Sequence, residues 1–148
     1  MEVILQAKPI IPPLQVLGAP LLAANEPLSF WGGFDYHSGE IIDRRHPLSG
    51  EIAAGKVLAL PFTRGSSTTT AVLLEAVRAG TAPAAILTTG VDTFFSLASV
   101  VADEMYAAPI PILALAPEDF PRLRSGDMLE IHPDGRIVLT THKPPIPT

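Results

Sequence analysis

The chain has 148 residues, of which 47% are hydrophobic and only 17% are charged, and its net charge is −5 at pH 7. Its length fits one domain, residues 1–148, that can bury a sufficient hydrophobic core without disulfide bonds or a bound metal. The acidic balance disfavours nucleic acid as a partner, and no apolar run reaches the ~20 residues that a membrane span needs. Because there is no cysteine and no secretory signal, we expect a cytoplasmic protein without disulfides, whose apolar surface meets another protein chain.

The first thirty residues alternate short apolar pieces with prolines, which favour strand edges and turns. We expect short strands at residues 3–6, 15–17 and 20–24. Residues 27–40 then combine four aromatic side chains with a pair of glycines and several loop-forming residues. This composition predicts a loop that packs under its own side chains and lines a cleft. The alternative is a turn in which Phe30 and Trp31 only fill the core.

Residues 41–43 should form a short strand, and Arg44, Arg45 and His46 lead out of it. These side chains could face an anionic ligand, although a charge run of this kind more often lies on a solvated face. The spacing of the four histidines is not typical of a metal site. We therefore expect no metal bound by this chain.

The central stretch is an apolar run at residues 56–60 that leads into Arg64, Gly65 and the hydroxyl cluster 66–70, after which apolar residues recur with helical spacing. This order predicts a strand, a tight loop and a helix. Hydroxyls on a first helical turn accept from free backbone N–H groups, and those donors also attract a carboxylate or a phosphate. Gly65 permits a sharp turn and Arg64 adds positive charge. The element therefore predicts an anion site, unless Ser66 or Ser67 is only a helix cap.

The following residues repeat this arrangement. Gly80 should end the first helix, and a buried strand at residues 84–89 precedes a second helix that Asp92 caps, followed by a strand at 109–115. Two successive β-α-β steps imply right-handed crossovers and a small parallel sheet. We expect one helical turn within residues 117–124, a hairpin of residues 126–131 and 136–140, and a loose tail at 143–148. The predicted fold class is α/β.

Three blocks of the sequence resemble the small-subunit, or swivel-domain, family of the aconitase X enzymes. The blocks are residues 27–35 (PLSFWGGFD), 46–50 (HPLSG) and 64–68 (RGSST), in that order. The resemblance extends over about residues 20–115. It implies a swivelling β/β/α domain that docks on a separate large subunit, with the active site between the two. The small parallel sheet, its two crossover helices, the β-rich start and the final hairpin agree with this fold.

The resemblance also implies roles for the central loop. In the aconitase superfamily, the first serine of a Gly-Ser-Ser loop acts as the base, and here that serine is Ser66. Aconitase follows its serine pair with an arginine that grips the substrate carboxylate, whereas this chain has Thr68. We therefore expect Arg64, Gly65, Ser67 and Thr68, or the partner, to hold the substrate. The iron–sulfur cluster of the family is expected on the large subunit, in agreement with the absence of cysteine here.

The resulting expectation is a hydro-lyase subunit that is inactive without its large subunit and that dehydrates a small hydroxy acid. The loop at residues 34–37 and the hydroxyls after Gly65 are more similar to bacterial cis-3-hydroxy-L-proline dehydratases. One alternative is the small subunit of an archaeal phosphomevalonate dehydratase. The other is an anion-binding module without catalysis.

Overall fold

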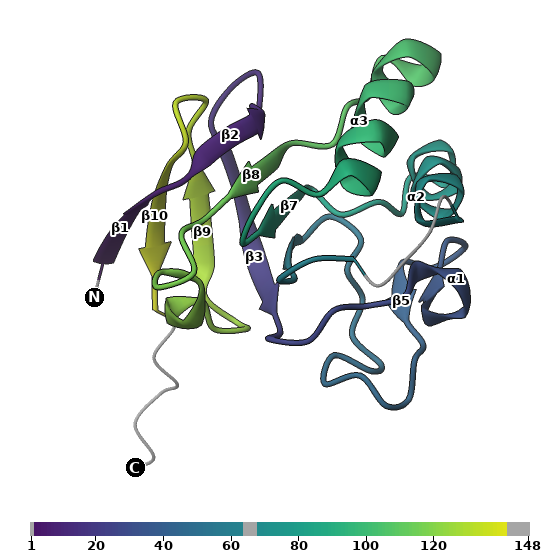
Figure 1. Ribbon diagram of the computed structural model, residues 1–148, viewed down its shortest axis with the longest axis horizontal. Helices are drawn as coiled ribbons and strands as arrows, with labels where there is room; N and C mark the ends of the chain where they lie inside the picture. Colours follow the sequence, from purple (N-terminus) through teal and green to yellow (C-terminus); the bar gives the residue numbers. More distant parts are fainter. Residues whose placement is uncertain (1, 64–67, 142–148) are drawn as a thin grey trace.

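The structure is a computed structural model, and it describes residues 2–63 and 68–141. Short strands and three α-helices alternate along this part of the chain (Figure 1). In chain order the elements are β1 (Glu2–Gln6), β2 (Lys8–Ile11), β3 (Leu17–Ala23), α1 (Phe30–Gly33), β4 (Phe34–Asp35), β5 (Glu40–Ile41), β6 (Val57–Ala59), α2 (Thr68–Ala79), β7 (Ala85–Thr88), α3 (Thr93–Tyr106), β8 (Ile112–Ala114), the 3-10 turn η1 (Phe120–Arg122), β9 (Met128–Ile131) and β10 (Arg136–Thr140).

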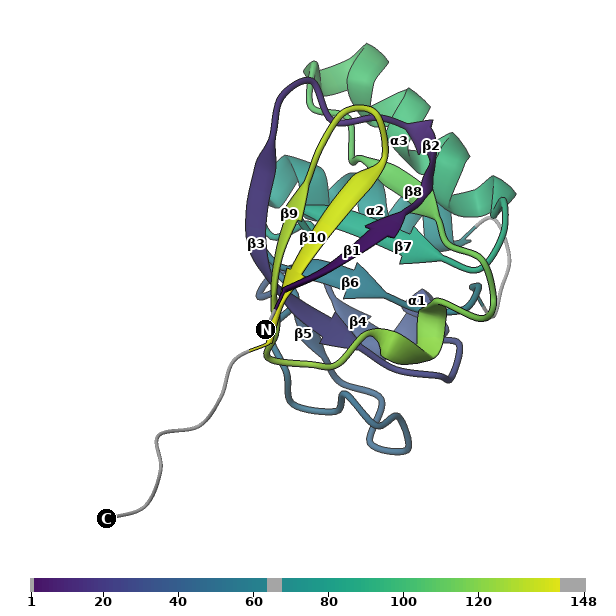
Figure 2. The same ribbon diagram turned by 90° about the vertical axis from the view of Figure 1, so that its left-hand side faces the viewer.

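One eight-stranded sheet organises the molecule, with the order β1-β10-β9-β3-β6-β7-β8-β2. Its two outermost strands are neighbours in sequence, since only Ala7 separates β1 from β2. β1 pairs antiparallel with β10, while β2 pairs antiparallel with β8 at the opposite edge. The first eleven residues therefore bring the two edges of the sheet together, and the sheet curls back on itself (Figure 2).

The β3-β6-β7-β8 part of the sheet is parallel, with α2 connecting β6 to β7 and α3 connecting β7 to β8. Both helices pack side by side on the same side of these strands (Figure 1). The two β-α-β steps, the small parallel sheet and the α/β fold class are confirmed. The hairpin β9–β10 is also confirmed, and η1 supplies the single helical turn. The expected tail at 143–148 lies outside the described residues.

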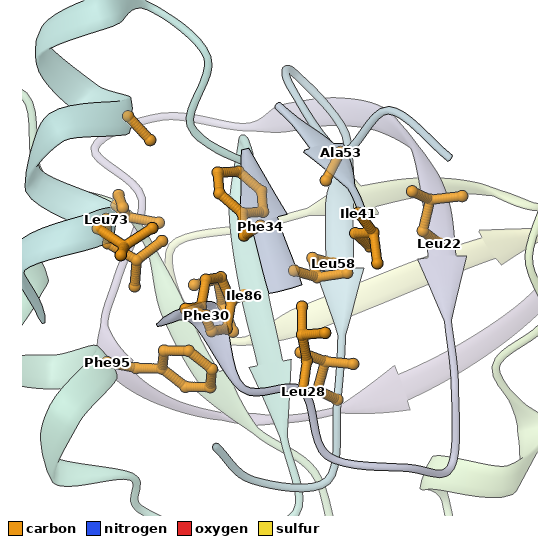
Figure 3. Packing of buried hydrophobic residues seen from close by; sticks show 14 of the residues in the cluster. Leu22, Leu28, Phe30, Phe34, Ile41, Ala53, Leu58, Leu73, Ile86 and Phe95 are labelled. Carbon is orange, nitrogen blue, oxygen red and sulfur yellow. The ribbon is translucent and has the colours of Figure 1, made fainter. Parts of the chain in front are cut away.

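Successive residues of the parallel strands face two separate cores. Leu58 and Ile86 point toward the helices, where they meet Phe30, Leu73 and Phe95 (Figure 3). Their strand neighbours pack on the other face of the sheet against the antiparallel strands, in a cluster that includes Val57, Ala59, Ala85, Leu87, Leu129 and Ile137. These strands read as continuously apolar because both of their faces are covered.

The amino-terminal strands differ from the expectation. The strands predicted at 15–17 and 20–24 are one strand, β3, which runs through Pro20. Pro20 is the last residue paired with antiparallel β9, and pairing with parallel β6 begins at Leu21, so the missing N–H falls where one ladder gives way to the other. β2 was not expected at all. It contains Pro9 and tolerates it because it is an edge strand whose register shifts at that point.

No helix among residues 2–63 and 68–141 combines the length and the apolar character needed to cross a membrane.

Candidate functional site

The predicted site falls on the connection between β6 and α2. Arg64, Gly65, Ser66 and Ser67 lie outside the described residues, and Thr68 is the half-buried first residue of α2. The structure describes the frame on either side of these positions. This frame stands at the carboxyl ends of parallel strands, where ligands bind in α/β sheets.

The chain that leaves β6 is held to the chain that leaves β7. The backbone N–H of Leu60 donates to the carbonyl of Leu87 at 3.0 Å. The carbonyl of Pro61 accepts from both the backbone N–H of Thr89, at 3.2 Å, and its hydroxyl, at 3.0 Å. The two strand ends therefore remain tied together beyond the last residues of the sheet.

The last described residue before the predicted loop, Thr63, is bound by a carboxylate of the other crossover. Its backbone N–H and its hydroxyl both donate to Oδ2 of Asp92, at 2.8 and 3.0 Å. The other oxygen, Oδ1, accepts from the backbone N–H groups of Phe94 and Phe95 at 3.0 and 3.2 Å, as predicted for the N-cap of α3. One carboxylate thus joins the start of α3 to the chain entering the loop.

The first turn of α2 is also attached to α3. Thr69 is buried, and the hydroxyl of Thr70 donates to the carbonyl of Phe94 at 3.3 Å. Thr69 and Thr70, the last two residues of the hydroxyl cluster 66–70, are therefore turned toward the protein interior and toward α3.

The aromatic segment 27–40 lies against this frame. Leu28 forms a parallel β-bridge with Thr63, and buried Phe30 packs on Phe34 and on Phe95, with ring centroids 5.4 and 5.5 Å apart. Phe30 therefore fills the core, as one of the two interpretations had it. Trp31 does not, since 71% of its surface is exposed.

Three exposed apolar side chains occur on the three segments that meet at this frame. They are Trp31, Phe62 at 54% exposure and Val91 at 65%. Phe62 and Val91 directly precede Thr63 and Asp92, which are hydrogen-bonded to each other. Composition had predicted excess apolar surface, but no sequence signal placed it beside the loop.

Arg45 and His46, from the run of charges at residues 44–46, line a pocket with Glu26, Pro27 and Asp43. Arg44 and Arg45 are exposed, which fits the interpretation as a solvated face. His46 is buried: its Nδ1 accepts from the backbone N–H of Leu48 at 3.1 Å, and its Nε2 lies 3.1 Å from the carbonyl oxygen of Glu26. Both ring nitrogens are therefore engaged by the backbone, and His46 has a structural role.

Within the two described ranges, no three side chains among His, Asp and Glu are grouped so that they could hold a metal ion.

Comparison with known proteins identifies relatives of this chain. The family model described as "Aconitase X swivel domain" matches residues 5–140. A cis-3-hydroxy-L-proline dehydratase of Pseudomonas aeruginosa is 43% identical over 92% of the chain. The phosphomevalonate dehydratase small subunit of Methanopyrus kandleri is 32% identical over 89% of the chain. The crystal structure of Thermococcus kodakaraensis aconitase X in its holo form superposes with a TM-score of 0.81 at 23% identity, over 94% of this chain and 99% of that one.

The relatives differ in how much of their length this chain spans. It spans 24% of the Pseudomonas dehydratase but 94% of the Methanopyrus small subunit. The same domain thus occurs both as part of a long chain and as a small chain of its own.

Proposed function

Because the chain belongs to the aconitase X swivel-domain family, we propose that it is the small subunit of a hydro-lyase that dehydrates cis-3-hydroxy-L-proline. The observation that carries this proposal is the 43% identity to a cis-3-hydroxy-L-proline dehydratase over nearly the whole chain. The rest of that relative's length would correspond to a separate, larger subunit. In this proposal the chain alone is inactive, and the substrate binds between the two subunits.

Ser66 is the proposed base. Dehydration of a hydroxy acid requires a base for the proton next to the carboxylate, assistance to the departing hydroxyl and stabilisation of the charge that develops. A serine can act as the base only as an alkoxide. The positive end of the helix dipole at the start of α2, and the cation of Arg64 two positions earlier in the sequence, would favour that anion.

Substrate contacts are proposed for Arg64, Gly65, Ser67 and Thr68. Arg64 would pair with the substrate carboxylate, and the glycine backbone would allow a close approach. Thr68 stands where aconitase has its carboxylate-gripping arginine, so its hydroxyl would replace a charged pair with a neutral hydrogen bond. The remaining attraction for the carboxylate would come from the larger subunit.

This chain's residues do not fit an iron–sulfur cluster. The sequence has no cysteine, and the described part of the chain has no grouped His, Asp and Glu side chains that could replace thiolates. We therefore assign the cluster expected of the family to the larger subunit.

The larger subunit is proposed to dock where the segments that carry Trp31, Phe62 and Val91 meet. These side chains expose apolar surface on the segments around the predicted loop. Burial of aromatic side chains at the centre of an interface supplies much of the binding energy of protein complexes. An apolar rim would also exclude water from the loop when the subunits close on it.

The test is an assay of the chain co-expressed with a candidate larger subunit. We expect turnover of cis-3-hydroxy-L-proline by the complex, none by the chain alone, and a kcat lower by ~10²–10⁴-fold in Ser66→Ala. Ser96→Ala on α3 is the control, because it also removes a hydroxyl at the start of a crossover helix. Equal weakening of binding by Ser66→Ala and Ser67→Ala, with kcat retained, would instead indicate an anion-binding module.

The second candidate is a phosphomevalonate dehydratase small subunit. It is favoured by one observation, the coverage of 94% of the Methanopyrus small subunit. Mevalonate 5-phosphate is therefore the second substrate in the assay, and turnover of it alone would replace the first candidate.

A further inference from the structure

We infer that Asp92 is a positioning residue for the predicted catalytic loop, in addition to being the cap of α3. The inference rests on the proposed function, in which Ser66 is the base. It concerns how this chain holds the loop rather than which residue performs the chemistry.

The carboxylate of Asp92 divides its two oxygens between two elements. Oδ1 accepts from the backbone N–H groups of Phe94 and Phe95, whereas Oδ2 accepts from the backbone N–H and the hydroxyl of Thr63. A helix cap needs only one side-chain oxygen. The second oxygen is used entirely by the residue that leads into positions 64–67.

The chain leaving the loop is attached to the same turn of α3. Thr70 donates its hydroxyl to the carbonyl of Phe94, which is one of the two residues that Oδ1 caps. The first turn of α3 therefore contacts the chain on both sides of positions 64–67. Ser66 is three residues from Thr63 and four from Thr70 in the sequence, so both contacts are close to the proposed base along the chain.

The turn to which both contacts attach is itself firmly placed. Phe95 is fully buried, and its ring meets that of Phe30 edge to face with the centroids 5.5 Å apart. The backbone N–H of Ser96 closes the same turn by donating to the carbonyl of Asp92 at 3.0 Å. Through its bonds to Thr63, Asp92 thus ties the residue before the loop to the packed start of α3.

An amide at position 92 would separate the two roles. Asparagine caps helices as well as aspartate does, but it has a single acceptor oxygen. In Asp92→Asn the oxygen can serve Phe94 and Phe95, while the NH₂ group faces the backbone N–H of Thr63 and cannot accept from it. The variant should therefore keep α3 capped and break the bond from the backbone N–H of Thr63, whose hydroxyl oxygen can still accept from the NH₂ group.

Two further variants complete the comparison. Thr63→Val removes the hydroxyl bond and keeps both the side-chain shape and the backbone N–H bond, so its effect should be smaller. Ser96→Ala removes a hydrogen bond from the same helical turn without touching Thr63, and it measures the cost of loosening α3 alone.

The experiment measures amide hydrogen exchange of residues 61–70, and kcat and KM, in the complex with the larger subunit. In Asp92→Asn we expect faster exchange at Thr63 and a kcat lower by about 10- to 100-fold with little change in KM, because a misplaced catalytic group slows turnover more than it weakens binding. Ser96→Ala should leave both measurements near those of the unmodified chain.

The outcomes distinguish this inference from the proposed function. If Asp92→Asn and Ser96→Ala are alike in exchange and in kcat, or if exchange rises while kcat is unchanged, Asp92 is only a cap and the inference is wrong. If Ser66→Ala retains full kcat, the proposed function fails and the positioning role fails with it.

Discussion

The crossovers through α2 and α3 have the same topology, but the residues at the start of the two helices differ. At the second crossover, Asp92 supplies the carboxylate that satisfies the free N–H groups of α3. At the first, the sequence has no acidic residue between Glu51 and Glu75, and Arg64, Ser66 and Ser67 precede α2. A helix start that already holds its own carboxylate has little use for an anionic ligand, whereas one flanked by a cation and hydroxyls favours an anion from outside.

The second crossover also supports the first. Asp92 and Phe94 contact the chain on both sides of the predicted loop, and Phe95 anchors them in the core beneath Phe30. The crossover through α3 is thus the supporting frame, and the crossover through α2 carries the candidate site. Three substitutions would break or sharpen this comparison.

The largest effect is expected from Phe95→Ala, which removes the buried ring that anchors the start of α3. Truncating a fully buried phenylalanine should lower the free energy of unfolding by about 3–5 kcal/mol, because a cavity remains where the ring met Phe30. Urea unfolding measures the change. Leu97→Ala, at a side chain that is 47% exposed on the same helix, should cost far less, and equal losses would show that the start of α3 is not the anchor.

Local sequence signals predicted most of this crossover pair. Asp92 as a cap and Gly80 as a helix end depend on contacts within a few residues, and the structure confirms both. The second use of Asp92 could not be predicted, because its partner Thr63 is 29 positions away and becomes a neighbour only when β6 and β7 pair.

The curling of the sheet could not be predicted either, because it also depends on partners that are distant in the sequence. β2 is recognisable only through its pairing with β8, about a hundred residues later in the chain. The exposure of Trp31 is a third case, since hydrophobicity alone places a tryptophan in the core, whereas here its neighbour Phe30 takes that position. Gly32, which adopts a positive φ of 78°, turns the backbone between Trp31 and the strand that follows.

A smaller effect is expected at the end of α2, where the two crossovers can be compared again. Gly80 has a φ of +78°, and the next residue, Thr81, donates its N–H to the carbonyl of Ala76. A Cβ at position 80 would meet no atom within 4 Å, so Gly80→Ala tests backbone strain alone. We expect a loss of about 1 kcal/mol in urea unfolding. Gly90→Ala is the matched control, because it also adds a Cβ in open space but has no positive φ; similar costs at both positions would contradict the explanation.

The smallest effect, and the one of opposite sign, is expected at the end of α3. Ala107 occupies the position that Gly80 has in α2: its φ is +52°, and the next residue donates its N–H to the carbonyl of Ala102. Alanine is strained in this conformation and glycine is not, although glycine also gains freedom in the unfolded chain. Ala107→Gly should therefore raise the free energy of unfolding by about 0.5 kcal/mol, as a slightly higher urea midpoint. A lower midpoint would mean that α3, unlike α2, gains nothing from glycine at its end, and that the two crossovers differ at both ends of their helices.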